Sequence, residues 1–201
     1  MKIIGITGNS GSGKTTLSAI FARKEKIKLI DADNVVKELS IPGTEYLNSI
    51  KETFGNDVFF EDGYLNRKKL ANKIYTNTTA CELLNKLTFK FVVNEIILRL
   101  EKLKNENLEY IVLDAPLLFE SNLNNYCDFV ISLISDINLK IKRICQRDNI
   151  DEETARKRLK IQQTNEYYIE KSDFVIENSE ACNLEKEVEN ILKKIEENFC
   201  E

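Results

Sequence analysis

The chain has 201 residues, with 29 Lys and Arg against 33 Asp and Glu and a formal net charge of −4. This acidic balance gives no basic surface for nucleic acid. No apolar run approaches the roughly 20 residues that span a bilayer. We expect one α/β domain of a globular protein that acts as a monomer, with no nucleic-acid or membrane partner.

The chain contains no histidine and five cysteines, which are Cys81, Cys127, Cys145, Cys182 and Cys200. The cysteines are scattered without a Cys-x-x-Cys pair, and the apolar N-terminal run leads into a glycine-rich loop, which argues against a signal peptide. This set predicts reduced thiols in a cytoplasmic protein and no cysteine-bound metal. Without histidine, a general base must be a carboxylate, lysine, cysteine or tyrosine.

The first predicted strand, at 2–7, runs into the stretch GITGNSGSGKTT, residues 5–16. The pattern Gly-x-x-x-x-Gly-Lys-Thr between a strand and a helix, here at about 14–24, is typical of a phosphate-binding loop. Its glycines let backbone N–H groups turn toward an anion, and the helix adds its positive N-terminal end. We expect Lys14 to stabilise the β- and γ-phosphates during transfer and Thr15 to ligate Mg²⁺. Gly8 and Gly13 are the defining glycines of this pattern.

The second predicted strand, at 27–31, ends in Asp31, and Asp33 follows after one alanine. A carboxylate at this position can accept the proton of an attacking hydroxyl, whereas a simple cap of the next helix is the alternative. We expect alternation along an extended chain to point both side chains the same way. We assign Asp33, two residues further toward the expected cleft, as general base, and Asp31 as its support in the substrate site.

The interval 32–108 is too long for a single crossover helix. Pro-Gly and Asp-Gly turns separate helical patterns near 44–54, 66–75 and 79–104. We therefore predict a mostly helical insert at about 32–108, built onto one end of the sheet.

The third predicted strand, at 109–114, ends its apolar run in Asp114. This arrangement is typical of a Walker B segment, whose carboxylate orients Mg²⁺ directly or through water. A buried strand that merely happens to end in aspartate is the alternative. Together with the phosphate loop, the pattern predicts Thr15 and Asp114 as the metal-site residues.

The fourth predicted strand, at 128–134, precedes a helix at 136–147 that carries Arg143 and Arg147. These arginines are four residues apart and so lie on one helical face. Guanidinium groups near a phosphoryl group in transfer clamp its oxygens and spread its charge, whereas a solvated basic face is the alternative. We favour Arg147, just before a turn, with Arg143 beside it.

A helical piece at 151–171 precedes the last predicted strand, at 173–177, and a final helix at 183–198. We expect residues of about 148–171 to form a lid over the nucleotide. Alternating strands and helices predict a five-stranded parallel sheet with right-handed crossovers. The core would comprise about 1–31 and 109–201 of a single domain.

The chain resembles the dephospho-CoA kinase family through stretches that occur in order: GITGNSGSGKTT, LIDADNVVKEL, PGTEYLNSIKETFG, DGYLNRKKLANKIYTN, VLDAPLLFE, KRICQRD and SDFVIENS. The resemblance implies a P-loop NTPase fold with a helical acceptor-binding insert and a lid. It also implies transfer of the ATP γ-phosphoryl to the ribose 3′-hydroxyl of dephospho-CoA, with Mg²⁺, in the last step of coenzyme A biosynthesis.

Matching the motifs residue by residue, the resemblance implies that Asp33 is the base and that Arg67 lies on the acceptor side. It implies that Arg143 and Arg147 lie beside the phosphates and the lid. It extends the phosphate loop to Gly11, Ser12 and Thr16.

The chain departs from the family pattern at Thr88-Phe89, where the family usually has His-Pro, and at Glu180, where a glycine is usual. Two other readings remain. One is a small-molecule P-loop kinase for a nucleoside monophosphate or a sugar acid. The other is a nucleotide-binding switch without phosphotransfer, which would lack an acid after the second strand and arginines in the lid.

Overall fold

The computed structural model describes residues 1–74 and 77–197. Cys200 and the expected ends of two helices, Tyr75 and Asn198, lie outside the described residues. The chain forms two compact units. We call Met1–Ile30 with Asn107–Glu201 the sheet unit and Asp31–Glu106 the helical unit. Among the described residues no helix is both long and apolar enough to cross a membrane.

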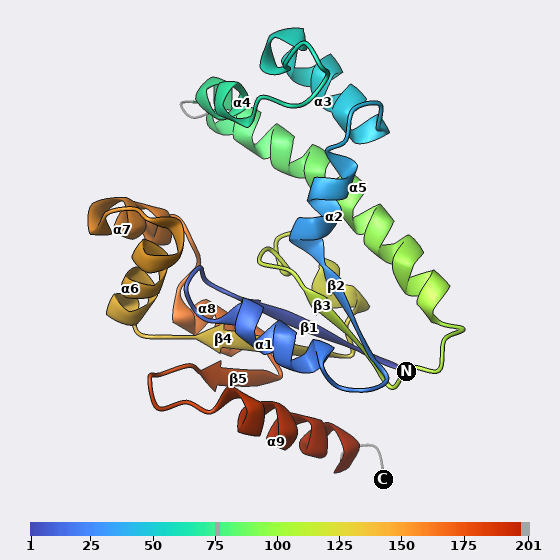
Figure 1. Ribbon diagram of the computed structural model, residues 1–201, viewed down its shortest axis with the longest axis vertical. Helices are drawn as coiled ribbons and strands as arrows, with labels where there is room; N and C mark the ends of the chain where they lie inside the picture. Colours follow the sequence, from blue (N-terminus) through green and yellow to red (C-terminus); the bar gives the residue numbers. More distant parts are fainter. Residues whose placement is uncertain (75–76, 198–201) are drawn as a thin grey trace. The chain divides into compact units, whose positions relative to one another are not determined.

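The sheet has five strands in the order β2-β3-β1-β4-β5 (Figure 1). Its strands are β1 Lys2–Gly8, β2 Ile27–Asp31, β3 Tyr110–Asp114, β4 Phe129–Ile134 and β5 Phe174–Glu177, which confirms all five predicted strands. Strand β1 pairs in parallel with β3 and β4, and β4 pairs in parallel with β5. Because Ile6 is opposite Asp114 and Gly8 is opposite Leu133, these strands end at one carboxyl edge.

Helices α1 Lys14–Ala22 and α9 Leu184–Glu197 pack against the strands to form the main hydrophobic core. Leu17 and Phe21 of α1 are fully buried in this core. Burial of each such side chain is worth about 1.5–3 kcal/mol. On Gly5 of β1, an added Cβ would lie 2.8 Å from the Cys127 sulfur and 2.9 Å from Leu118, so this position has no room for a side chain.

The helical piece predicted at 151–171 is present and consists of two helices. The structure has α6 Ile137–Asp148, α7 Glu152–Lys160 and α8 Asn165–Lys171. The break occurs because Thr164 starts a new helix, with its hydroxyl accepting the Tyr167 N–H at 3.3 Å.

The helical unit contains the three helices predicted for the long interval and one more at its start. The additional helix is α2 Ala32–Leu39, and the predicted ones are α3 Glu45–Phe54, α4 Arg67–Ile74 and α5 Thr78–Leu103. The buried core of this unit is formed by Tyr46, Leu47, Ile50, Phe54, Val58 and Leu70. Thr44 caps α3 and Asn77 caps α5, since each side chain accepts a backbone N–H of the first turn.

The predicted alternation of Asp31 and Asp33 was wrong, because β2 ends at Asp31 and α2 begins at the next residue. Asp31 Oδ1 accepts the N–H groups of Asp33 at 2.8 Å and Asn34 at 3.1 Å, as an N-cap does. Asp33 is exposed in the first turn of α2. Asp31 therefore caps the next helix, which is the alternative that the sequence analysis gave for these acids.

Gly13 generates a stability prediction. The φ of Gly13 is +105°, and a Cβ added to this residue would lie 2.2 Å from Asn178 Nδ2. Gly43 also has a positive φ, of +91°, but a Cβ added to Gly43 would have no atom of the described residues within 4 Å. Left-handed strain costs about 1–2 kcal/mol and overpacking adds about 1–3 kcal/mol. We expect Gly13→Ala to lower the free energy of urea unfolding by about 3 kcal/mol and Gly43→Ala by only the strain. Equal losses would contradict the role of Asn178.

Candidate active site

The loop between β1 and α1 ends in Gly13, which is the N-cap of α1 and carries no side-chain cap. The first turn of α1 therefore receives no side-chain oxygen from its N-cap residue, although the Gly13 carbonyl accepts the Thr16 N–H at 3.1 Å. A helix start of this kind favours an anion, because the N–H groups of the first turn and the helix dipole both attract negative charge.

Lys14 folds back along the loop in this structure. Its Nζ donates to the carbonyl oxygens of Gly8 at 2.7 Å and Asn9 at 3.0 Å. An ammonium group has three donors, so it can turn toward a phosphate oxygen while retaining a carbonyl contact. The lysine is thus already held at the mouth of the loop.

A cavity of about 420 Å³ in the sheet unit adjoins this loop. Its lining residues are Gly11, Gly13, Lys14, Thr15, Thr16, Arg143, Arg147, Asn178 and Leu184. The structure therefore brings most of the predicted loop residues together with both predicted arginines. Gly8 ends β1 beside them, and Ser12 is fully buried within the loop.

The two arginines of α6 make different contacts. Arg143 Nη1 donates to the Gly11 carbonyl and to Ser135 Oγ, both at 3.2 Å. Arg147 pairs with Asp148 through Nε–Oδ1 at 2.7 Å and Nη2–Oδ2 at 2.9 Å, and Arg158 also pairs with Asp148. The hydrogen bond from Arg147, and to a smaller extent the one from Arg158, lowers the pKa of the Asp148 carboxyl. This carboxyl therefore stays ionised at neutral pH.

Asp114 and Thr15 offer the oxygen donors that Mg²⁺ prefers. Ser18 Oγ donates to Asp114 Oδ2 at 2.6 Å, which draws the carboxylate toward α1. Thr15 lies one turn earlier on the same helix and is exposed. No group of three or more His, Cys, Asp or Glu suited to a metal occurs among the residues described. One carboxylate and one hydroxyl fit a Mg²⁺ ion that takes its other ligands from phosphate and water.

Three predicted site residues belong to the helical unit. Asp31 is the N-cap of α2, Asp33 lies in the first turn of that helix, and Arg67 begins α4. The Arg67 side chain is exposed, and its Nη2 donates to Ser40 Oγ at 3.3 Å. Thr88, which with Phe89 replaces the usual His-Pro pair of the family, has its Oγ1 3.1 Å from the hydroxyl of Tyr46.

Sequence reasoning missed Asn178 and Ser135. Asn178 is 6% exposed, and its Nδ2 donates to the Ser12 carbonyl at 2.7 Å. Ser135 Oγ in turn donates to the Asn178 carbonyl at 2.6 Å. Each residue directly follows a strand, β5 or β4, at the edge where the loop lies. Their position after predicted strands was a usable signal.

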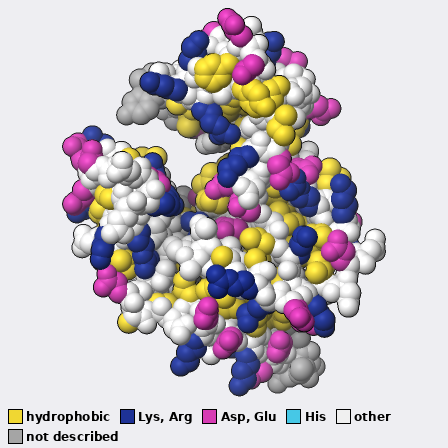
Figure 2. All heavy atoms as spheres, in the orientation of Figure 1, with side chains coloured by type: hydrophobic (Ala, Val, Ile, Leu, Met, Phe, Trp, Pro, Cys, Tyr) yellow, Lys and Arg dark blue, Asp and Glu magenta, His cyan; other side chains and the backbone are white. Residues whose placement is uncertain are grey.

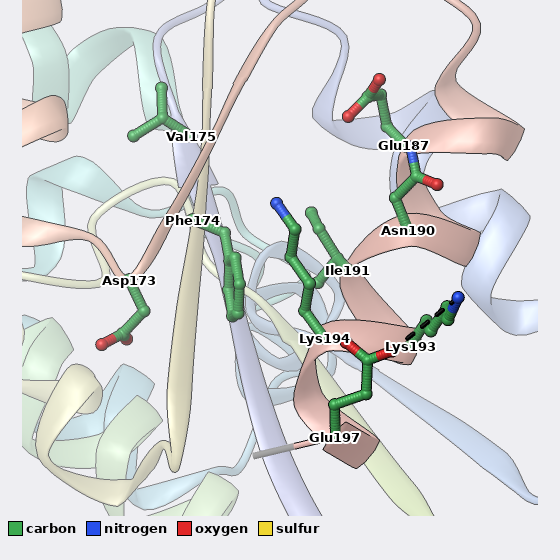
Figure 3. A pocket seen from close by; sticks show the side chains of 9 residues that line it. All are labelled: Asp173, Phe174, Val175, Glu187, Asn190, Ile191, Lys193, Lys194 and Glu197. Atoms are coloured by element: carbon green, nitrogen blue, oxygen red, sulfur yellow. Dashed lines mark ion pairs between the residues drawn. The ribbon is translucent and has the colours of Figure 1, made fainter.

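A second cavity, of about 450 Å³, lies between β5 and α9 (Figure 3). Charged side chains of both signs surround it, and one pair, Lys193 with Glu197, is 3.8 Å apart. It contains none of the predicted site residues, so the cavity at the phosphate loop remains the candidate. On the face shown in Figure 2, basic and acidic side chains are interspersed, in keeping with the charge balance of the chain.

Comparison with known proteins identifies the family. A family model described as dephospho-CoA kinase matches residues 2–183. The chain belongs to the dephospho-CoA kinase family. A dephospho-CoA kinase from Fusobacterium nucleatum is 38% identical over 199 residues, covering 99% of this chain and 97% of the relative.

Solved structures agree with this family fold. A protein from Thermus thermophilus matches with a TM-score of 0.80 at 23% identity, covering 96% of this chain and 97% of that one, and this likeness shows the fold alone. A dephospho-CoA kinase from Campylobacter jejuni matches with a TM-score of 0.68 at 26% identity, covering 98% of both chains. The predicted P-loop NTPase fold and kinase family are confirmed.

The position of Lys14 generates the first functional prediction. Lys14→Met removes the cation that faces the loop, so phosphoryl transfer should fall by roughly 10²–10³-fold. The fold should persist, because the strands and core do not depend on this ammonium. Lys142→Met is the matched control, since Lys142 on the neighbouring α6 pairs with Glu180 outside the lining of the cavity. Turnover of Lys14→Met within tenfold of the control would refute the assignment.

Proposed function

We propose that this protein transfers the γ-phosphoryl group of ATP to the ribose 3′-hydroxyl of dephospho-CoA, giving coenzyme A and ADP. The observation that carries the proposal is the cavity that joins Lys14 with Arg143 and Arg147 at a phosphate loop. Membership of the dephospho-CoA kinase family supports this acceptor over a nucleoside monophosphate or a sugar acid.

In the proposed reaction the loop N–H groups bind the phosphates, and Lys14 stabilises negative charge between the β- and γ-phosphates. Arg147 and Arg143 clamp phosphate oxygens from the side of α6. Residues of about 148–171 act as a lid that excludes water, which prevents loss of the γ-phosphoryl to hydrolysis. The Arg147–Asp148 pair supports a lid-side position for this guanidinium.

Thr15 and Asp114 are the residues we propose to hold Mg²⁺. When bound, the ion would offset charge on the β- and γ-phosphates. The hydrogen bond from Ser18 keeps one carboxylate oxygen of Asp114 turned to α1. We further propose that the enzyme acts as a monomer in the cytoplasm, on ATP and dephospho-CoA, with no nucleic-acid or membrane partner.

We assign Asp33 as the general base that accepts the proton of the ribose hydroxyl. Asp31 has a structural role instead, because its Oδ1 accepts two backbone N–H groups as the cap of α2. A capping carboxylate is held for a structural purpose, and Asp33 is exposed in the first turn of the same helix. Asp31 supports the base by fixing that turn, and Arg67 is proposed as an acceptor-side cation.

The acceptor is tested by incubating the protein with ATP, Mg²⁺ and one acceptor at a time, and measuring ADP release. We expect dephospho-CoA to be the fastest acceptor, with the Lys14→Met protein as the inactive control. Faster phosphorylation of AMP, shikimate or gluconate would overturn the proposed function. ADP release that is independent of any acceptor would point to the switch-like alternative.

The two aspartates are separated by matched substitutions. Asp33→Asn should lower kcat by roughly 10²–10⁴-fold with near-normal ATP binding, because general-base assistance is lost. Asp31→Asn keeps an oxygen that can cap α2, so its kcat should fall much less. Both kcat values and calorimetric ATP affinities are measured on the same preparations. A normal kcat for Asp33→Asn with a reduced one for Asp31→Asn would exchange the two roles.

A further inference from the structure

The segment that joins α7 to α8 is hydrogen-bonded to the first half of the phosphate loop. The Ser10 N–H donates to Gln162 Oε1 at 2.9 Å, and Gln162 Nε2 donates back to Ser10 Oγ at 2.9 Å. Asn9 Nδ2 donates to the backbone oxygen of Gln163, also at 2.9 Å. These hydrogen bonds therefore join parts of the chain that are far apart in the sequence: Ser10 and Gln162 are 152 positions apart, and Asn9 and Gln163 are 154 positions apart.

The two Gln162 contacts form a matched pair. A carboxamide has one oxygen acceptor and two N–H donors, so it can bind the main-chain N–H and the hydroxyl of one serine simultaneously. Gln162 is partly buried, and the Asn9 side chain beside it is 5% exposed. Asn9 Oδ1 is buried and makes no hydrogen bond in the described part of the chain. Its Nδ2 contact to Gln163 is thus what orients this amide.

The two halves of the loop are held from different places. Arg143 holds the Gly11 carbonyl and Asn178 holds the Ser12 carbonyl, so α6 and the segment after β5 fix the second half. The first half is held by Lys14 and by Gln162 with its neighbour. When Lys14 turns toward a phosphate, its contact with the Asn9 carbonyl weakens, and Gln162 remains to hold Ser10.

We infer that Gln162 is a positioning residue, which fixes the Asn9–Ser10 half of the phosphate loop from the proposed lid segment. Its side-chain contacts are to the N–H and the hydroxyl of Ser10. Its effect is to keep the loop in a shape that suits the triphosphate while Lys14 exchanges partners. The inference rests on the proposed kinase function, because the consequence that it predicts concerns ATP.

The experiment compares Gln162→Ala with Gln163→Ala. The control keeps the Gln163 backbone oxygen, which is the only atom of that residue bonded to the loop among the described contacts. Two hydrogen bonds are lost in Gln162→Ala, so exchange of the Ser10 amide hydrogen should accelerate about tenfold by NMR. kcat/KM for ATP should fall by a similar factor, with KM for dephospho-CoA unchanged. Gln163→Ala should match wild type in every measurement.

A double-mutant cycle with Ser10→Ala separates positioning from general loosening. In the Ser10→Ala background, Gln162→Ala should cost less in kcat/KM for ATP than it does in the wild-type chain, because one shared bond is already gone. Fully additive losses, an unchanged Ser10 exchange rate, or an unchanged kcat/KM for ATP would each overturn the inference. If the wild-type protein forms no coenzyme A, the proposed function fails, whereas the exchange rate still tests the Gln162–Ser10 contact by itself.

Discussion

A loop that binds an anion through backbone N–H groups must turn its carbonyl oxygens outward, and those oxygens need donors. In this protein side chains donate to four of these carbonyl oxygens. Lys14 serves the Gly8 and Asn9 carbonyls, Arg143 serves Gly11, and Asn178 serves Ser12. The shape of the phosphate loop is thus set by what surrounds it as much as by its own glycines.

The parallel sheet makes this arrangement possible. Strands β1 and β4 are neighbours and β5 follows β4, so the segments after all three strands emerge at one edge. Ser135 after β4 and Asn178 after β5 meet there and are bonded to one another. The helix that follows β4 then carries Arg143 to the Gly11 carbonyl. A change of strand order would remove these donors from the loop.

Asp148 of the sheet unit stays ionised at neutral pH. Asp148 is paired with two arginines, and their hydrogen bonds hold the pKa of its carboxyl well below the usual range. A carboxyl whose pKa is lowered on folding contributes stability above its unfolded pKa and loses it as the pH falls through the folded value. The ion pairs of Asp148 with Arg147 and Arg158 are therefore intact throughout the neutral pH range. In contrast, burial lowers the pKa of Lys140, whose Nζ donates to Asn165 Oδ1 at 3.1 Å.

The helical unit has a hydrophobic core of its own, and its link to the proposed chemistry is the start of α2. Asp31 caps this helix, which fixes the backbone of the turn that bears Asp33. Further along, Glu38 of α2 pairs with Arg99 of α5, and Arg99 also contacts Glu95 at 2.8 Å. These contacts hold α2 against the long helix, so the helix that carries the proposed base is braced at both ends.

The sequence by itself determined the strands, the phosphate loop and the family, because these depend on local apolar runs and on the spacing of Gly8, Gly13 and Lys14. It could not determine the break between α7 and α8, or the turn at Asp31, since a short capping residue competes with continuation of the preceding element. Only the tertiary structure showed that Asn178 and Gln162 hold the loop. Asn178 contacts Ser12 across 166 positions of the sequence, and Gln162 contacts Ser10 across 152 positions. No local sequence pattern encodes such a pairing.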